Sequence, residues 1–210
     1  MNLLGIESSS KKLSVGLMKG KKFTELHSEK INDTANSLPL LSKKVIKEAQ
    51  LNFEDLDAIC ISAGPGSFTG LRVGMSYAKG IAMALDIPII PVSTFDSIIE
   101  NQNIQKLSTL IYSHGKTFYI CDYLLVDGNL EKSNEPKSIL KEDVLKLSQN
   151  IFFNGPLNVF EELESQNLKI KFKKLSVKNI INIAQKNFKL LKTKSLDNLV
   201  PEYVGNFEVK

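Results

Sequence analysis

The sequence contains no tryptophan, two histidines, two cysteines and one arginine among its 210 residues. Cys60 and Cys121 lie inside apolar runs, which favours buried free thiols over a disulfide or a metal site. The only histidines, His27 and His114, are too far apart to form the His-x-x-x-His pair of a helical zinc site. No apolar run approaches the ~18 residues of a membrane helix, and the N-terminus does not resemble a signal peptide. We therefore expect a cytoplasmic protein that binds no metal ion of its own.

The remaining composition is that of an ordinary globular chain, with 42% hydrophobic and 24% charged residues and a net charge of +4. Residues 1–100 are neutral, so residues 101–210 carry the whole excess, and lysines are densest over residues 169–178. Such runs are usually solvated faces, and Phe172 is the single aromatic residue within this one, too few to form a row for stacking on bases. We therefore do not expect this chain alone to bind nucleic acid. The single arginine, Arg72, is a candidate for a contact that needs planar, bidentate geometry.

Hydrophobic periodicity predicts a mixed α/β protein. Alternating or fully apolar runs predict strands at residues 3–6, 13–18, 23–27, 58–62, 87–92, 107–113, 117–126 and 151–153. Apolar residues spaced by three and four predict helices at residues 34–50, 69–85, 138–149 and 177–191. The polar stretch 100–105 suggests a boundary, giving an N-terminal subdomain over residues 1–103 and a smaller, degenerate one with a C-terminal tail over 104–210. The two halves open with loosely similar strand patterns, which favours a duplicated fold.

The most informative segment is residues 63–74, AGPGSFTGLRVG. A glycine-rich turn between a buried strand and a helix start presents free backbone N–H groups, so it is a generic site for an anion. It lacks the Lys-Ser/Thr pair of a Walker loop and the spacing of a dinucleotide fingerprint.

Small residues recur at every fourth position along the helix that follows. This glycine ridge consists of Gly66, Gly70, Gly74, Ala78 and Ala82. Each helical glycine costs about 1 kcal/mol relative to alanine, so the ridge needs a close neighbour, either in this chain or in another subunit. A different face carries the bulky residues Leu71, Met75, Ile81 and Leu85, which can supply the core. We therefore expect the ridge to meet a partner.

Three segments of the chain resemble the TsaB (YeaZ) family. The segment GPGSFTGLRVGMSYAKGIA at residues 64–82 resembles the family's signature, and LLGIESSS at residues 3–10 resembles its first phosphate loop. Pro201-Glu202-Tyr203 resembles its C-terminal Pro-x-Tyr. The resemblance implies an actin-like ATPase fold, an α/β architecture of two RNase H-like subdomains with mixed sheets flanked by helices. Older descriptions of the family use the label glycoprotease (peptidase M22-like).

The resemblance also implies a function. The chain would be a non-catalytic subunit of the complex that makes N6-threonylcarbamoyladenosine (t6A37) in tRNA. It would bind a TsaD-type catalytic subunit, with a TsaE-type ATPase as a further partner, and would meet tRNA through the complex; a homodimer is an alternative assembly. No cofactor is required by this chain, although ATP or ADP could bind at a subunit interface.

Two groups of residues are the candidate sites, and neither is catalytic. The expected partner interface comprises Leu38, Leu41, Val45, Gly70, Arg72, Gly74, Ala78 and Ala82. The expected degenerate nucleotide or phosphate site comprises Glu7, Ser8, Ser9, Ser10, Gly64, Gly66 and Ser67.

The alternative function is an actin-like nucleotide-binding ATPase or kinase that acts alone. Glu7 follows the first strand, where such folds carry an acidic residue. A working enzyme of this type also needs a second phosphate loop with another carboxylate. Many relatives carry Asp-Ala-Arg in that region, whereas this chain has Tyr112-Ser113-His114. The departure disfavours independent ATP hydrolysis.

Overall fold

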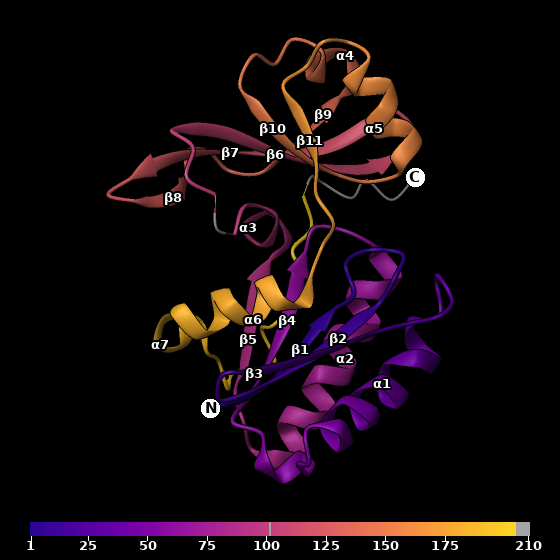
Figure 1. Cartoon of the computed structure of the whole chain (residues 1–210), viewed down its shortest axis with the longest axis vertical. Coiled ribbons are helices and arrows are strands. Elements are labelled where there is room, and N and C mark those ends of the chain that lie inside the picture. Colours follow the sequence, from indigo (N-terminus) through magenta and orange to yellow (C-terminus); the bar gives the residue numbers. More distant parts are fainter. Residues whose placement is uncertain (101, 205–210) are drawn as a thin grey trace. The chain divides into compact units, whose positions relative to one another are not determined.

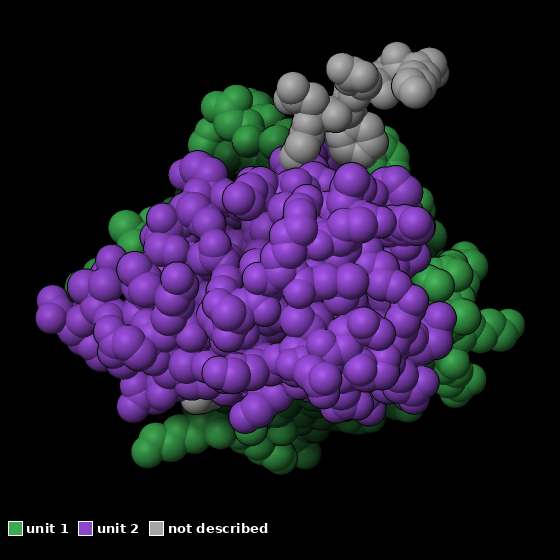
Figure 2. Space-filling model, turned by 90° about the horizontal axis from the view of Figure 1, so that it is seen from above, with its two compact units in different colours: residues 1–97, 175–202 green, residues 98–174, 203–210 purple. Residues whose placement is uncertain are grey.

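The computed structural model describes residues 1–100 and 102–204, and the chain divides into two compact units. Unit 1 comprises residues 1–97 and 175–202, and unit 2 comprises residues 98–174 and 203–210 (Figure 2). The chain first passes from unit 1 to unit 2 after residue 97, near the expected boundary at residue 103. The chain then returns, however, so that residues 175–202 belong to unit 1 and not to the C-terminal unit in which the sequence placed them. The reason is the apolar face of the segment that begins at Val177, which packs on the first sheet.

Unit 1 is built on a five-stranded mixed sheet in the order β3-β2-β1-β4-β5 (Figure 1). Its strands are β1 (Asn2–Glu7), β2 (Ser14–Lys19), β3 (Lys22–His27), β4 (Ala58–Gly64) and β5 (Ile89–Ser93). β2 is antiparallel to β1 and β3, whereas β4 and β5 run parallel to β1. This arrangement is the RNase H-like sheet that the resemblance implied.

Helices cover both faces of this sheet. On one face lie α1 (Thr34–Glu48) and α2 (Phe68–Leu85), and on the other lie α6 (Val177–Lys186) and the short α7 (Phe188–Leu191) (Figure 1). Because β1 and β4 are covered on both sides, they are almost continuously apolar and buried. Two short helical segments complete this part of the chain, η1 (Phe53–Asp55) and α3 (Thr94–Ile99).

Unit 2 repeats the same strand order with different helices. Its sheet runs β8-β7-β6-β10-β11, with β9 also paired to β7. The elements are β6 (Lys106–His114), β7 (Thr117–Val126), β8 (Asn129–Lys132), β9 (Lys137–Leu140), α4 (Lys141–Val144), β10 (Asn150–Asn154), α5 (Leu157–Glu164) and β11 (Ile170–Phe172). β7 is antiparallel to β6, while β10 and β11 are parallel to it. Apart from β9, this sheet therefore matches the first strand for strand, as a duplicated fold requires.

The predicted α/β class with two mixed sheets flanked by helices is confirmed. The predicted helix over residues 138–149 is wrong, because its first part is strand β9 and only Lys141–Val144 is helical. The sequence analysis also missed β8, β11, α3 and α5. Among the described residues, no helix has both the length and the apolar character that a membrane crossing would need.

Candidate functional site at the start of helix α2

The turn that follows β1 packs directly against the first turns of α2. The amide of Ser67 donates a hydrogen bond to the carbonyl oxygen of Ser9 at 2.6 Å. The Ser67 hydroxyl caps the helix by accepting the amide of Gly70 at 3.2 Å. On the other side of the turn, the amide of Ser8 donates to the hydroxyl of Ser62 on β4 at 3.1 Å. The start of α2 is thus tied to the ends of both central strands.

Glycine makes this close approach feasible. A Cβ atom on Gly66 would collide with the carbonyl oxygen of Ser9, and one on Gly70 with the carbonyl oxygen of Ser8. A Cβ on Gly74 would collide with the Ser8 side chain and lie 3.4 Å from Ile61. The close neighbour of the three glycines in the ridge is therefore this chain's own turn after β1, and the expectation that the ridge faces a partner is wrong.

Glu7 ends β1 as a buried carboxyl group beneath the turn. Its Oε1 accepts the amide of Ser9 at 2.7 Å and the Ser9 hydroxyl at 2.5 Å. Burial raises the pKa of Glu7 to about 7, and hydrogen bonds from Ser9, Ser10 and Ser62 limit the rise. Within the described residues, Glu7 Oε2 and the Ser8 hydroxyl have no hydrogen-bond partner. The raised pKa brings the protonated form of Glu7 within reach of neutral pH.

The C-terminal segment crosses the end of β4 beside the same turn. The amide of Glu202 donates to the carbonyl oxygen of Ala63 at 2.6 Å. Gly64 has φ of +116°, and a Cβ there would lie 2.6 Å from the carbonyl oxygen of Glu202. Both the backbone conformation and the close approach therefore require glycine. The backbone of Glu202, the middle residue of the Pro-x-Tyr segment, thus lies against the glycine-rich turn.

The structure brings together all of the residues expected at a degenerate phosphate site. Glu7, Ser8 and Ser9 are buried, and Ser10 is half-buried with its hydroxyl donating to the carbonyl oxygen of Lys12. Helix N-termini bind phosphate through free amides. Here the amides of Ser67 and Gly70 already have partners in the chain, and the Ser9 carbonyl lies against Gly66.

The residues expected at a partner interface lie mostly inside unit 1. Leu38 and Val45 on α1, and Ala78 and Ala82 on α2, are at most 2% exposed. Gly70 and Gly74 are also buried, and Leu41 is half-buried against the same core. Six of the eight residues are therefore excluded as surface contacts because they fill the layer between the helices and the sheet. Arg72 is exposed, and its guanidinium carbon lies 3.6 Å from the centre of the Phe68 ring.

The outward face of α1 and α2 was missed by the sequence analysis. Leu40 on α1 is 69% exposed and Met83 on α2 is 72% exposed. Ser76, Gly80 and Ala84 on α2 are also exposed, and they are spaced four residues apart. Nothing lies within 4 Å of a Cβ built on Gly80. The signal was present in the sequence, because this second small row has the same spacing as the glycine ridge.

Comparison with known proteins shows the kinship of the chain. A family model described as "TsaD: tRNA N6-adenosine threonylcarbamoyltransferase" matches residues 27–204. A Buchnera aphidicola (subsp. Baizongia pistaciae) protein named "tRNA threonylcarbamoyladenosine biosynthesis protein TsaB" is 25% identical over 97% of both chains. A Haemophilus influenzae protein of the same name is 32% identical over 48% of this chain and 42% of its own length.

Solved structures show the same relationship at the level of the fold. The structure of a protein "with similarity to peptidase YEAZ from Pseudomonas aeruginosa" superposes with a TM-score of 0.81 at 20% identity. The match covers 97% of this chain and 99% of that one. A second structure, "YeaZ from Pseudomonas aeruginosa", matches with a TM-score of 0.78. The chain therefore belongs to the TsaD family of tRNA N6-adenosine threonylcarbamoyltransferases, and within it to the TsaB (YeaZ) proteins.

Proposed function

We propose that the chain is a non-catalytic subunit of the complex that synthesises t6A37 in tRNA, where it binds and supports a TsaD-type catalytic subunit. A TsaE-type ATPase is the further partner, and tRNA is modified by the assembled complex. The names of the TsaB relatives support a role in the biosynthesis of threonylcarbamoyladenosine in tRNA. We propose that the chain needs no cofactor of its own and that any ATP or ADP binds at a subunit interface.

The packing of the turn after β1 against α2 carries the non-catalytic part of the proposal. A phosphate at the helix start would compete with the Ser9 carbonyl for the amide of Ser67, and would have to open the contact of Gly66 and Gly70 with the turn. The two histidines, His27 on β3 and His114 on β6, do not form the His-x-x-x-His pair of a helical zinc site. The site therefore favours a structural role over phosphate chemistry.

The outward face of α1 and α2 is the surface that we assign to the catalytic subunit. The two helices contact each other, and each bears a large exposed apolar side chain, Leu40 on α1 and Met83 on α2. Ser76, Gly80 and Ala84 let a partner helix approach α2 closely, because none of them has a bulky side chain. Exposed Met and Leu beside a smooth helical row suit helix-on-helix docking. We expect the isolated chain to self-associate through the same face.

Gly80→Leu tests this assignment. The new side chain meets open space in the free chain, so the variant should fold, while a partner helix could no longer approach α2. Asn158→Leu is the matched control, because it adds the same apolar side chain at an exposed helical position of unit 2. We expect calorimetry with the catalytic subunit to show at least tenfold weaker binding for Gly80→Leu and unchanged binding for Asn158→Leu. Equal affinities for both variants would exclude the α1–α2 face.

Activity measurements test the non-catalytic role. The purified chain should neither hydrolyse ATP nor form t6A, and addition of the catalytic subunit with its substrates should make the second assay positive. Turnover by the chain alone, above a heat-treated control, would instead support the nucleotide-hydrolysing alternative.

A further inference from the structure

Helices α6 and α7 present a polar face whose composition differs from that of the other helices. Val177, Ile180, Ile181 and Ala184 are completely buried against the sheet. The exposed lysines on the opposite side recur at near-helical spacing. We call Lys178, Lys186, Lys189 and Lys192 the α6–α7 lysine face. It lies on the other side of the sheet from α1 and α2 (Figure 1).

This face lacks acidic residues along the chain. From Val177 to Lys192 the sequence has no aspartate or glutamate, although it has four lysines. Among the described residues, Lys178, Lys189 and Lys192 form no ion pair, whereas Lys194 pairs with Asp86 on the exposed end of α2 at 2.9 Å. Of the strands beneath α6, β3 contributes Glu25, which pairs with His27 at 3.8 Å, and β1 contributes the buried Glu7. Three of the four lysines on this face therefore have no acidic partner among the described residues.

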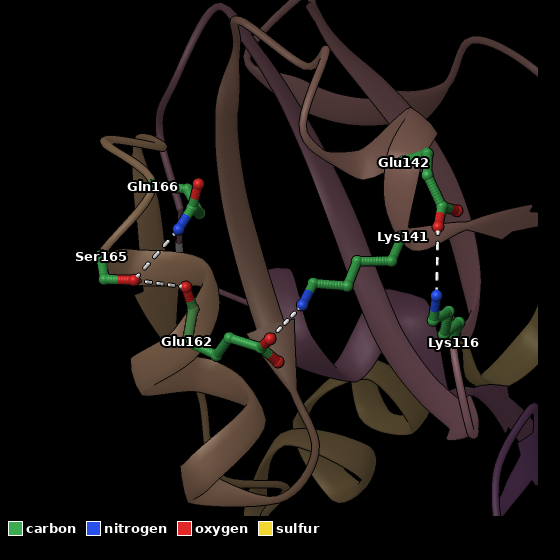
Figure 3. Close-up of polar contacts among 6 residues, drawn as sticks. All are labelled: Lys116, Lys141, Glu142, Glu162, Ser165 and Gln166. Atoms are coloured by element: carbon green, nitrogen blue, oxygen red, sulfur yellow. Dashed lines mark hydrogen bonds and ion pairs between the residues drawn. The ribbon is translucent and has the colours of Figure 1, made fainter.

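Lysines in unit 2 are arranged differently. Lys116 lies 3.7 Å from Glu142, and Lys141 pairs with Glu162 on α5 (Figure 3). Lys146 pairs with Asp143 at 2.7 Å. Lysine abundance alone therefore does not produce an uncompensated face, because these three lysines of unit 2 have acidic partners.

Aromatic rings support two of the α6–α7 lysines. The Lys178 ammonium lies 5.6 Å from the centre of the Phe23 ring, and that of Lys192 lies 5.4 Å from the Phe188 ring. Such contacts restrain the long side chains while the ammonium groups stay exposed. Asn182 and Gln185 lie between the lysines and add amide donors. The face is therefore a row of hydrogen-bond donors along two consecutive helices and the residue that follows them.

In contrast to the expectation from the sequence, we propose that the α6–α7 lysine face binds the phosphate backbone of RNA directly, and that in the complex proposed above it holds the tRNA. The identity of the RNA as tRNA rests on that proposed function. Lysines and amides make sequence-independent contacts to phosphates, which position an RNA without reading its bases. A protein partner would need an apolar centre in its interface. Of the exposed side chains on α6 and α7, Leu190 is the large apolar one.

The test measures binding of the full chain to a fluorescently labelled tRNA transcript across a salt series. The test variant replaces Lys178, Lys186, Lys189 and Lys192 with glutamine, which keeps helix propensity nearly unchanged. The control variant replaces the exposed unit 2 residues Lys132, Lys137, Lys169 and Lys171 with glutamine, so that both variants lose the same charge. Circular dichroism confirms that each variant is folded.

The expected result is a change in salt dependence that is specific to the test variant. Each lost phosphate contact lowers the slope of log Kd against log salt by about 0.7–0.9, so four lost contacts should lower it by about 3. We expect the control variant to keep the wild-type slope. Absence of wild-type binding at about 50 mM salt, or equal losses in both variants, would overturn the proposal.

Two further measurements identify the partner and separate the proposals. Polyglutamate at equal charge should compete poorly with tRNA; equally good competition would assign the face to an acidic protein and refute RNA. Binding of the catalytic subunit is measured on the same preparations, and the test variant should retain it. If even the wild-type chain fails to bind the catalytic subunit while the RNA results hold, the complex assignment fails and the RNA-binding face stands.

Discussion

Replacement by alanine should lower the free energy of unfolding at Gly70 of α2, but should leave it unchanged or raise it at Gly80 of the same helix. Both replacements add one methyl group and gain up to about 1 kcal/mol of helix propensity. At Gly70 the new Cβ would collide with the carbonyl oxygen of Ser8, a backbone atom held in place by the hydrogen bond from the Ser8 amide to Ser62. At Gly80 it would meet nothing within 4 Å. The difference in free energy of unfolding between the two variants therefore measures the packing cost at Gly70.

The size of that difference follows from typical overpacking costs. Inserting a methyl group into a filled space costs about 1–3 kcal/mol, because a backbone atom cannot rotate away as a side chain can. Since the propensity gains nearly cancel, Gly70→Ala should be about 1–3 kcal/mol less stable than Gly80→Ala. For a chain of this size each kcal/mol shifts the melting temperature by about 2–4 °C. Gly80→Ala itself should match or exceed the wild type.

Urea unfolding followed by circular dichroism measures both free energies, and an unchanged denaturant slope shows that the unfolded state is comparable. Equal stability of the two variants would refute the packing of α2 against the turn after β1. If Gly80→Ala is less stable than Gly70→Ala, then Gly80 lies on the buried face of α2 and Gly70 on the exposed face, opposite to the structure.

Three further changes test other parts of the structure. Because burial raises the pKa of Glu7 from 4.5 to about 7, its stability contribution is complete below pH 4.5 and is lost as the pH rises through about 7. Glu7→Gln should remove this slope and be more stable than wild type at high pH by up to about 3 kcal/mol in urea unfolding; an unchanged slope would refute a buried, titrating Glu7. Burial likewise raises the pKa of the Cys60 thiol, so alkylation should be slow in the folded chain and fast in denaturant, and rapid labelling of native Cys60 would contradict its position on β4. Arg72→Lys keeps the charge but loses the planar stack on Phe68, so it should weaken binding of the catalytic subunit in calorimetry with little change in melting temperature; unchanged affinity would remove Arg72 from the interface.

The sequence predicted those elements whose stability is local or whose strands are wholly buried. β1 and β4 appear as apolar runs because helices cover both faces of their sheet, and α1 shows the spacing of a one-sided helix. The error at residues 138–149 has a different origin. Leu140, Val144 and Leu147 are spaced by four and three and so imitate one face of a helix, although Leu140 is exposed and Val144 is buried. Pairing of β9 with residues 117–120 of β7 overrides that pattern, and a long-range ladder cannot be read from local periodicity.

The C-terminal segment shows why the division into units could not be predicted either. Composition indicated a boundary near residue 103, and nothing in the sequence order suggests a second crossing. The evidence lies in the glycines of the first sheet, since a Cβ on Gly5 or Gly16 would collide with Val177. Glycine at these positions of β1 and β2 therefore leaves room for α6, which lies more than 150 residues further along the chain. Two glycines in buried strands are compatible with many neighbours, so the identity of the one that packs there is fixed only by the assembled fold.

The same reasoning explains the error over the partner interface. Two rows of small residues run along α2, one through Gly70, Gly74 and Ala78, and one through Ser76, Gly80 and Ala84. Each satisfies the spacing of a close helical contact, so periodicity cannot assign one row to the core and the other to a partner. The turn after β1 decides between them, because the Ser8 carbonyl oxygen lies against Gly70 and the Ser8 side chain lies against Gly74. The position of this turn depends on the hydrogen bonds of Ser8 and Ser9 to β4 and α2. The second row faces outward, and we therefore assign to it the partner-docking surface that the sequence analysis had assigned to the first row.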